Sequence, residues 1–350
     1  MTDDSVKPGR PVRPTIRDVA RLANVSIGTV SAVLNNSARP VAADTRAHVL
    51  RCIAELNFEP NNAARSLKHQ RISSIGFIVP DLGNAFFADV AEGIQGVLDH
   101  LDCLLVLCMT WADTQREEYY AQVLRTQRLN GVIYLSGTGL PSPSLMRLAQ
   151  QGAVVFVDEC LPGIDAPFIS AQNLLGARAM AQYVLGRGHR RLAVLGGPRG
   201  LWTSEQRLAG FREAFAAADI MPDSVPVLSG DYTEASGSRA ADTIINLPAT
   251  ERPTAVLCAN DLIAIGFIRR CRERGIAVPE HISVTGFDDI PAARLLSPAL
   301  TTVRQPGNAM GRAAATLLLQ RIGALPDAPC PSEFSTELRI RHSVGQGPSA

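Results

Sequence analysis

Apolar residues recur at helical spacing in three short segments near the start of the chain. Within each segment they lie three or four residues apart, which is typical of a helix with one buried face. A tight turn is expected at Asn24-Val25, between the first two segments. The apolar spacing therefore predicts an all-α domain over residues 15–60. Its apolar positions are, in order, Ile16, Val19, Ala20 and Ala23; Val30, Val33 and Leu34; and Val49, Ile53 and Leu56.

The pattern changes after residue 73, where continuous apolar runs alternate with helical segments. Apolar strands separated by helices are typical of parallel sheets covered on both faces. There are too many strands for one compact sheet, which favours an α/β core of two doubly wound parallel-sheet subdomains with a cleft between them. The expected strands are 74–79, 103–108, 131–135, 153–157, 192–196, 254–258 and 282–286, and the expected helices lie near 86–100, 115–129, 172–187, 205–218, 234–246, 261–274 and 307–322.

Composition sets the limits of these parts. Residues 1–14 are rich in Pro and charge, and we expect a disordered arm there. Residues 343–350 are rich in Gly and Pro, and we expect a flexible tail. Between the helical head and this tail, the core is expected to span 72–342. Its subdomain one is expected at about 72–170 and 303–330, and its subdomain two at about 171–302 and 331–342.

The net charge of +1 hides an uneven distribution. Residues 1–71 hold eleven Lys or Arg and six Asp or Glu, a net charge of +5, whereas the remainder has a net charge of −4. A basic head on a mildly acidic body indicates that the head meets a polyanion. Two short helices joined by a tight turn and braced by a third are also typical of a helix-turn-helix, so the polyanion we expect is DNA. From the helical pattern alone, a helical cap on the core is an equal alternative.

Several classes of protein are disfavoured. The polar N-terminus predicts no signal peptide, and no apolar run approaches the ~20 residues of a membrane span. The seven Cys form no CxxC pair, which fits reduced thiols in a cytoplasmic protein. The six His are scattered, and neither HExxH nor the loops GxSxG, GxGxxG or Walker A occur. We therefore expect no enzyme, no metal and no cofactor.

Ordered motifs run through residues 15–342. They include Thr15-Ile-Arg-Asp-Val-Ala, Val33-Leu34-Asn35, Arg207-Leu-Ala-Gly-Phe211, Gly286-Phe-Asp-Asp289 and Pro298-Ala-Leu-Thr-Thr302. Together they resemble the lactose/galactose repressor family of bacterial transcription regulators. The resemblance implies a helix-turn-helix, a hinge helix with its linker in 61–71, and a core similar to periplasmic sugar-binding proteins. It also implies a homodimer on a pseudo-palindromic operator in double-stranded DNA.

The second helix is expected to read the major groove with its N-terminal residues. The segment 62–68 resembles the family's hinge helix, in which Leu67 is a wedge in the minor groove, although composition alone would favour an ordinary core leucine. Ile27, Gly28 and Ala32 are short or apolar, so we expect weak direct readout of bases. The expected DNA contacts are Thr15, Ser26, Ile27, Gly28, Thr29, Ser31, Ala32 and Asn35 in the head, and Asn62, Ala64, Arg65, Leu67 and Lys68 in the hinge.

Polar and aromatic residues follow the expected strands at the edge where parallel sheets bind ligands. Hydroxyls need donors and acceptors, and a sugar ring needs an aromatic face, so this set predicts a sugar-like effector. Some members have structural alternatives, since Asn84 and Asp261 are candidate helix caps. Release of DNA by the effector is favoured, and corepression stays open, as does a sugar-binding protein. The expected effector contacts are Asp81, Asn84, Phe86, Ser136, Asp158, Arg207, Tyr232, Asn260 and Asp288.

Overall fold

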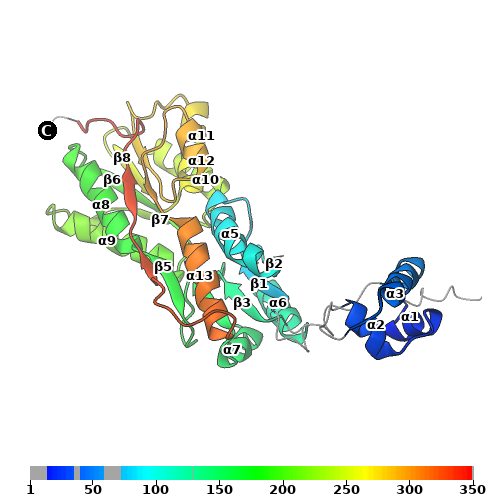
Figure 1. Cartoon of the computed structure of the whole chain (residues 1–350). Helices are drawn as coiled ribbons and strands as arrows, with labels where there is room; N and C mark the ends of the chain where they lie inside the picture. The colour runs from blue at the N-terminus through cyan, green and yellow to red at the C-terminus, as the bar shows by residue number, and fades with distance from the viewer. Residues whose placement is uncertain (1–13, 35–39, 59–71, 128, 349–350) are drawn as a thin grey trace, which may run out of the picture. The chain divides into compact units, whose positions relative to one another are not determined.

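A computed structural model describes residues 14–34, 40–58, 72–127 and 129–348 of the chain. The chain divides into two compact units, residues 1–71 and residues 72–350 (Figure 1). The expected arm, apart from Pro14, and the predicted DNA contacts Asn35, Asn62, Ala64, Arg65, Leu67 and Lys68 lie outside the described residues.

The first unit holds the three expected helices, α1 (Ile16–Leu22), α2 (Ile27–Leu34) and α3 (Ala43–Glu55). At the start of α1 the Asp18 carboxylate accepts hydrogen bonds from the Thr15 amide and hydroxyl, at 2.9 and 2.7 Å. At its end Asn24 adopts a φ of 50°, and the Val25 amide bonds to the Ala20 carbonyl at 3.0 Å. This Schellman turn sets the sharp angle between α1 and α2.

Ser26 caps α2 as predicted, because its hydroxyl accepts a hydrogen bond from the Thr29 amide at 3.1 Å. The N-cap position of α3 is Ala42, which has no side chain to cap the helix, and Asp44 lies in the first turn. Buried side chains from all three helices, among them Val19, Val30 and Val49, form one core. The first unit is therefore an all-α domain with the spacing of a helix-turn-helix.

The second unit contains a six-stranded parallel sheet in the order β11-β5-β4-β3-β1-β2. Along β1, Ile75, Phe77 and Val79 pack in the core that contains α5 and α13, and Ile78 faces α6 and α7, as the alternation of a strand requires (Figure 1). The elements are β1 (Ser74–Val79), β2 (Leu104–Met109), β3 (Gly131–Tyr134), β4 (Val154–Val157), β5 (Phe168–Ala171), β11 (Glu333–Phe334), α5 (Ala85–Leu98), α6 (Thr114–Thr126), α7 (Pro143–Gln150) and α13 (Gly307–Arg321).

A four-stranded parallel sheet in the order β7-β6-β8-β9 forms the other half of this unit. Leu192 and Val194 of β6 pack with α8 and α9, whereas Ala193 and Leu195 pack with α10 and α11. The α/β prediction of two doubly wound sheets is thus confirmed. The elements are β6 (Leu192–Gly196), β7 (Val227–Ser229), β8 (Ala255–Cys258), β9 (Ser283–Thr285), α8 (Asn173–Gly186), α9 (Trp202–Ala216), α10 (Glu234–Ile245), α11 (Asp261–Glu273) and α12 (Pro291–Leu295).

The chain crosses between the sheets through β10 (Thr302–Arg304) and β12 (Glu337–Arg339), which pair antiparallel. β11 pairs with β5, so Glu333 and Phe334 belong to subdomain one and their predicted place in subdomain two is wrong. The prediction of a flexible tail from residue 343 is also wrong for Ser343 to Gly347. The Ser343 hydroxyl accepts a hydrogen bond from the Thr301 amide at 2.8 Å, and Val344 is buried, because this segment fills an edge of the second sheet.

Candidate effector site and DNA-binding surface

A buried guanidinium, that of Arg207 on α9, lies at the centre of the candidate effector site. Its Nε donates to the Asn173 Oδ1 at 2.8 Å, and its Nη1 donates to the Ala259 carbonyl at 2.6 Å. The same Nη1 lies 3.6 Å from the Asp288 carboxylate, and the guanidinium stacks 4.0 Å over the Phe287 ring. These partners come from three different segments, namely the start of α8 and the turns after β8 and β9, so Arg207 both organises the cluster and is fixed by it.

Asp288 connects the two subdomains. Its carboxylate accepts a hydrogen bond from the side-chain amide of Asn84 at 3.2 Å, and Asn84 precedes α5 in subdomain one. The Gln305 amide at the crossover also donates to it, at 2.8 Å. Asp288 has a φ of 117°, in a region that L-residues rarely adopt. The surrounding contacts therefore hold Asp288 in a strained backbone conformation at the point where the two subdomains meet.

Asp158 and Glu159 follow β4 in a tight turn. Asp158 has a φ of 64°, and the Glu159 amide bonds back to the Val157 carbonyl at 2.8 Å, which describes a γ-turn. Asp158 is only 6% exposed, and its Oδ1 has no hydrogen-bond partner. Glu159 accepts hydrogen bonds from the Thr203 amide, at 3.2 and 3.4 Å, and from the Thr203 hydroxyl. Thr203 lies in the first turn of α9, so Glu159 spans the cleft.

Tyr232 closes the other side of this cluster. Its φ of 62° is rare for a bulky residue, and its ring occupies the space where a Cβ on Gly197 would lie, with the ring carbons 2.3 and 2.4 Å from that position. The Tyr232 hydroxyl is 3.2 Å from the Thr203 hydroxyl. The Asn260 amide donates to the Tyr232 carbonyl at 3.0 Å, while its Oδ1 caps α11 by accepting from Ile263. Asn260 therefore belongs to the cluster, but its polar atoms hold the fold.

Burial changes the protonation chemistry of the carboxylates. Loss of water raises the pKa of Asp158, an effect that the Arg207 charge opposes and the Asp288 charge reinforces. Burial likewise raises the pKa of Glu159, and the Asp158 charge adds to that rise. The pKa of Asp288 is raised by burial too, against the lowering effect of Arg207, Asn84 and Gln305. The site therefore disfavours several negative charges at once.

The N-terminal part of α2 presents an accessible surface. Ser26, Ile27 and Gly28 are exposed, Thr29 and Ser31 are partly exposed, and Thr15 is exposed at the start of α1. Ala32 is only 6% exposed, so its expected place among the outward-facing residues is wrong. Successive helix residues turn by about 100°, which puts Ala32 next to the inward-facing Val33, and a single methyl group is too short to reach out.

The comparisons with known proteins agree with this geometry. Residues 15–61 match the family described as bacterial regulatory proteins, lacI family, and residues 181–344 match a periplasmic binding protein-like domain. The chain is 35% identical over 337 residues to the HTH-type transcriptional repressor PurR of Klebsiella pneumoniae subsp. pneumoniae, which covers 95% of this chain and 98% of PurR. The chain belongs to the lacI family of bacterial regulatory proteins. It is a DNA-binding transcriptional regulator.

Solved structures of lacI-family regulators have the same fold. One is the lac repressor dimer bound to operator and the anti-inducer ONPF, with a TM-score of 0.77, 27% identity, and coverage of 95% of this chain and 99% of that one. Another is the complex of the transcriptional regulator CelR with cellobiose, with a TM-score of 0.67, 30% identity, and coverage of 95% and 100%. Both similarities span the head and the core.

In this lacI-family core, six of the nine predicted effector residues lie in the Arg207 cluster or next to it: Asn84, Asp158, Arg207, Tyr232, Asn260 and Asp288. Asp81 does not join them, because its carboxylate accepts from the Gly83 and Asn84 amides in its own turn. Ser136 likewise accepts from the Thr138 and Gly139 amides in its own loop. Glu159 and Thr203 were missed, although Glu159 stands beside a predicted residue.

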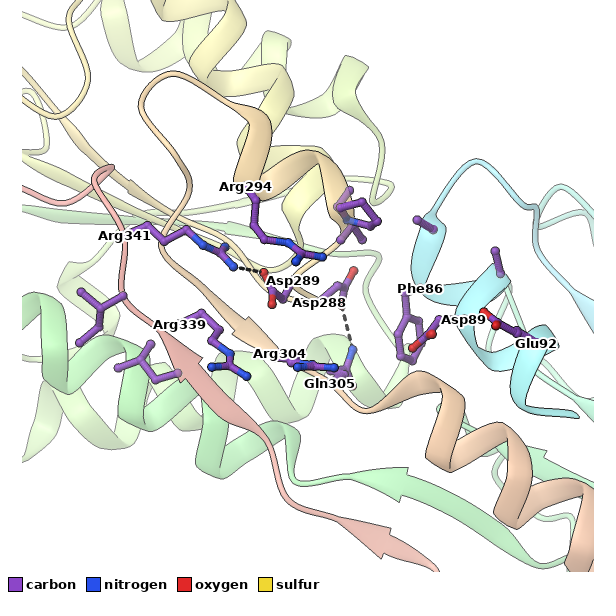
Figure 2. A pocket seen from close by; sticks show the side chains of 16 residues that line it. Phe86, Asp89, Glu92, Asp288, Asp289, Arg294, Arg304, Gln305, Arg339 and Arg341 are labelled. Atoms are coloured by element: carbon purple, nitrogen blue, oxygen red, sulfur yellow. Dashed lines mark hydrogen bonds and ion pairs between the residues drawn. The ribbon is translucent and has the colours of Figure 1, made fainter. Parts of the chain in front are cut away.

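A cavity of about 800 Å³ lies beside the cluster, at the crossover strands. Figure 2 shows Arg294, Arg304, Arg339 and Arg341 gathered on one side, with Phe86, Asp89 and Glu92 across from them. Of the predicted effector residues only Phe86 and Asp288 line it, so this cavity and the Arg207 cluster meet at Asp288. The described residues hold no group of three or more His, Cys, Asp or Glu able to bind a metal ion. None of the described helices has both the length and the apolarity to cross a bilayer.

Proposed function

We propose that this regulator is a repressor that binds a pseudo-palindromic operator as a homodimer and is released by a small sugar-like effector bound around Arg207. The observation that carries the proposal is the cluster itself. Arg207, Asp288, Asp158 and Tyr232 meet at the carboxyl ends of strands from both subdomains, which is where ligands bind in doubly wound folds. The Asp158 Oδ1 is a buried acceptor that lacks a donor within the protein.

Contacts across the cleft indicate how a bound effector acts on the core. Asn84 bonds to Asp288, and Glu159 bonds to Thr203, so groups of the protein itself hold the two subdomains together. A ligand that enters the cluster replaces one or both contacts and changes how the subdomains meet, which is the kind of change that biases a two-state regulator. Of the two directions we propose induction, because the site has the groups that a sugar needs. Corepression is the opposite sign of the same response.

An exposed apolar edge supports the homodimer. Strand β2 is at the end of the six-stranded sheet, and Leu104, Leu107 and Met109 are 70%, 44% and 37% exposed. An apolar edge strand of this kind is a pairing hazard unless a partner covers it. We propose a second copy as that partner, in keeping with the dimer described for the lac repressor. Two copies present two helix-turn-helix units, which requires an operator with dyad symmetry.

The experiment is an operator mobility-shift assay with a graded series of a sugar that raises the melting temperature of the protein. Asp288→Asn removes the charge that faces Arg207, so the variant should need about 10- to 100-fold more sugar for release, the effect of losing a charged hydrogen bond of roughly 1.5–3 kcal/mol. Operator affinity without sugar is measured in parallel, so that each release curve starts from the affinity of its own protein.

Asp81→Asn is the matched control, because Asp81 lies at the same edge of the core but bonds only to its own turn. It should respond to sugar as the wild type does. A release curve for Asp288→Asn that coincides with the wild-type curve would remove Asp288 from the site.

A further inference from the structure

The acidic groups of the Arg207 cluster outnumber its basic groups. Asp158, Glu159 and Asp288 are all buried, and Arg207 is the cation that they share. Arg207 is the ion-pair partner of Asp288, and the ion pairs among the described residues leave Asp158 and Glu159 without a cation of their own. Two buried carboxylates without a counter-charge are expensive, so a protein keeps them where something else neutralises them.

Arg207 is held in place by its partners in subdomain two. Its Nε and Nη1 donate to Asn173 and Ala259, and its charge is set against Asp288. The guanidinium is also held over the Phe287 ring, which fixes its plane. It therefore cannot turn toward Asp158 without breaking contacts that hold the second sheet to α9.

The backbone brings the two carboxylates to one place. The γ-turn at Asp158 puts both side chains at the end of β4, and Glu159 reaches the first turn of α9 across the cleft. There Thr203 supplies two donors to Glu159, while the Asp158 Oδ1 is buried with no donor at all. What is missing is a donor with positive charge between subdomains one and two.

We infer that the effector has a protonated amine beside its hydroxyl groups, and that Asp158 and Glu159 bind this amine. The inference rests on the proposed function, in which the cleft takes a sugar-like effector. An ammonium group has three N–H donors and a full charge, so it satisfies the free Asp158 oxygen and neutralises the pair. A neutral hydroxyl gives one donor and brings no positive charge.

The test compares ligands that differ only in the amine. Glucosamine is titrated against glucose, and 1-amino-1-deoxyglucitol against glucitol, by calorimetry with the full chain at about pH 7, where both amines are largely protonated. At least one amine should bind about tenfold or more tightly than its neutral counterpart. Asp158→Asn and Glu159→Gln should each abolish this preference, and Asp81→Asn should keep it.

A second measurement uses only the wild-type protein, in case a variant fails to fold. The titratable groups around the pair are Arg207, Asp288, Tyr232 and Cys160. Burial raises the pKa of both carboxyls, the charge of Asp288 adds to the rise at Asp158, and Arg207 opposes the rise at both. The aminoglucitol must displace those protons, so its affinity should rise from about pH 6 to about pH 8, while the affinity of glucitol stays flat.

Each outcome of these titrations either supports or contradicts an amine bound by Asp158 and Glu159. A neutral sugar that binds as tightly as its amine and releases the operator overturns the inference and leaves the proposed function standing. Amines that fail to bind at millimolar concentration overturn it as well. If the proposed function itself is wrong, the result is different: neither neutral nor amine-bearing sugar-like compounds change operator binding.

Discussion

Three residues of the Arg207 cluster have backbone conformations that most side chains avoid. Asp158, Tyr232 and Asp288 have φ values of 64°, 62° and 117°. Such conformations persist only where the surroundings determine them, and they concentrate at functional sites. Here they aim side chains from three different strand ends at one guanidinium. The strain is therefore the local cost of building the site.

The buried carboxyls predict how stability depends on pH. Their pKa values are raised in the folded protein, so between about pH 4 and the raised pKa the folded state binds more protons than the unfolded state. Stability should fall as pH rises through that range. Asp158→Asn and Glu159→Gln remove the titrating groups, so each should raise the free energy of unfolding at about pH 8 by on the order of 1–3 kcal/mol relative to wild type, and by less at about pH 5.5.

Urea denaturation at the two pH values measures this effect. Other groups also titrate, since Asp261 and Asp288 have raised pKa values and His189 a lowered one, but they are shared by wild type and variants. The difference between proteins isolates the pair. Variants less stable than the wild type at about pH 8 would mean that the pair holds the fold together.

Among the predicted site residues, those that end an apolar strand or lie in a motif are the ones that the structure brings together. Arg207 and Asp288 were found in this way. Glu159 was not predicted as a site residue. Its partner, Thr203, belongs to a helix that begins three residues earlier than the apolar pattern indicates. Ala32 was misplaced because helical spacing alone does not tell whether a short side chain at the border of a face stays covered.

At the scale of elements, helices α10 and α11 touch through glycine. A Cβ on Gly266 of α11 would lie 1.9 Å from the Glu234 carbonyl oxygen, and a Cβ on Gly237 of α10 would lie 2.0 Å from the Ile263 carbonyl oxygen. Backbone atoms cannot rotate away as a side chain can. The two helices therefore lie close enough to bury α11 against β8 and β9, directly behind Asn260.

Gly266→Ala should separate these helices and destabilise the protein by about 1–3 kcal/mol, the usual penalty of overpacking. Gly186→Ala is the matched control, because Gly186 is also helical and a Cβ there meets nothing within 4 Å. The control should be stable or gain roughly 0.5–1 kcal/mol, since alanine favours helices. Thermal melts of both variants compare the two. Equal melting temperatures would contradict the close approach of α10 and α11.

The predictability of elements depended on their length. The long helices and the seven apolar strands lie within a few residues of their predicted positions. Strands β5, β7 and β10 to β12 have two to four residues each, and several are polar, so they have no pattern long enough to recognise. Residues 343–347 are ordered by the sheet edge they cover, and that partner is distant in sequence.

At the scale of the whole molecule, a DNA-binding unit is joined to an effector-binding core. The subdomains meet through polar contacts across the cleft, such as Asn84 with Asp288, and through Leu262, Ile265 and Ile290, which pack with the core of subdomain one. The segment that joins the two units, with the predicted wedge Leu67, lies outside the described residues. Coupling between the units is therefore a property to be measured on the full chain bound to DNA.

Footprinting on DNA selected from a randomised pool tests this coupling most directly. The short side chains of Ile27 and Gly28 leave room for DNA deformation to add to specificity, so the selected site should be a pseudo-palindrome in which changing the central step weakens binding as much as changing a half-site, by about 1–3 kcal/mol. At one fixed salt concentration, a saturating effector should abolish protection of both half-sites together. An asymmetric site, or protection that every sugar-like ligand leaves intact, would contradict a dimeric repressor released through the Arg207 cluster.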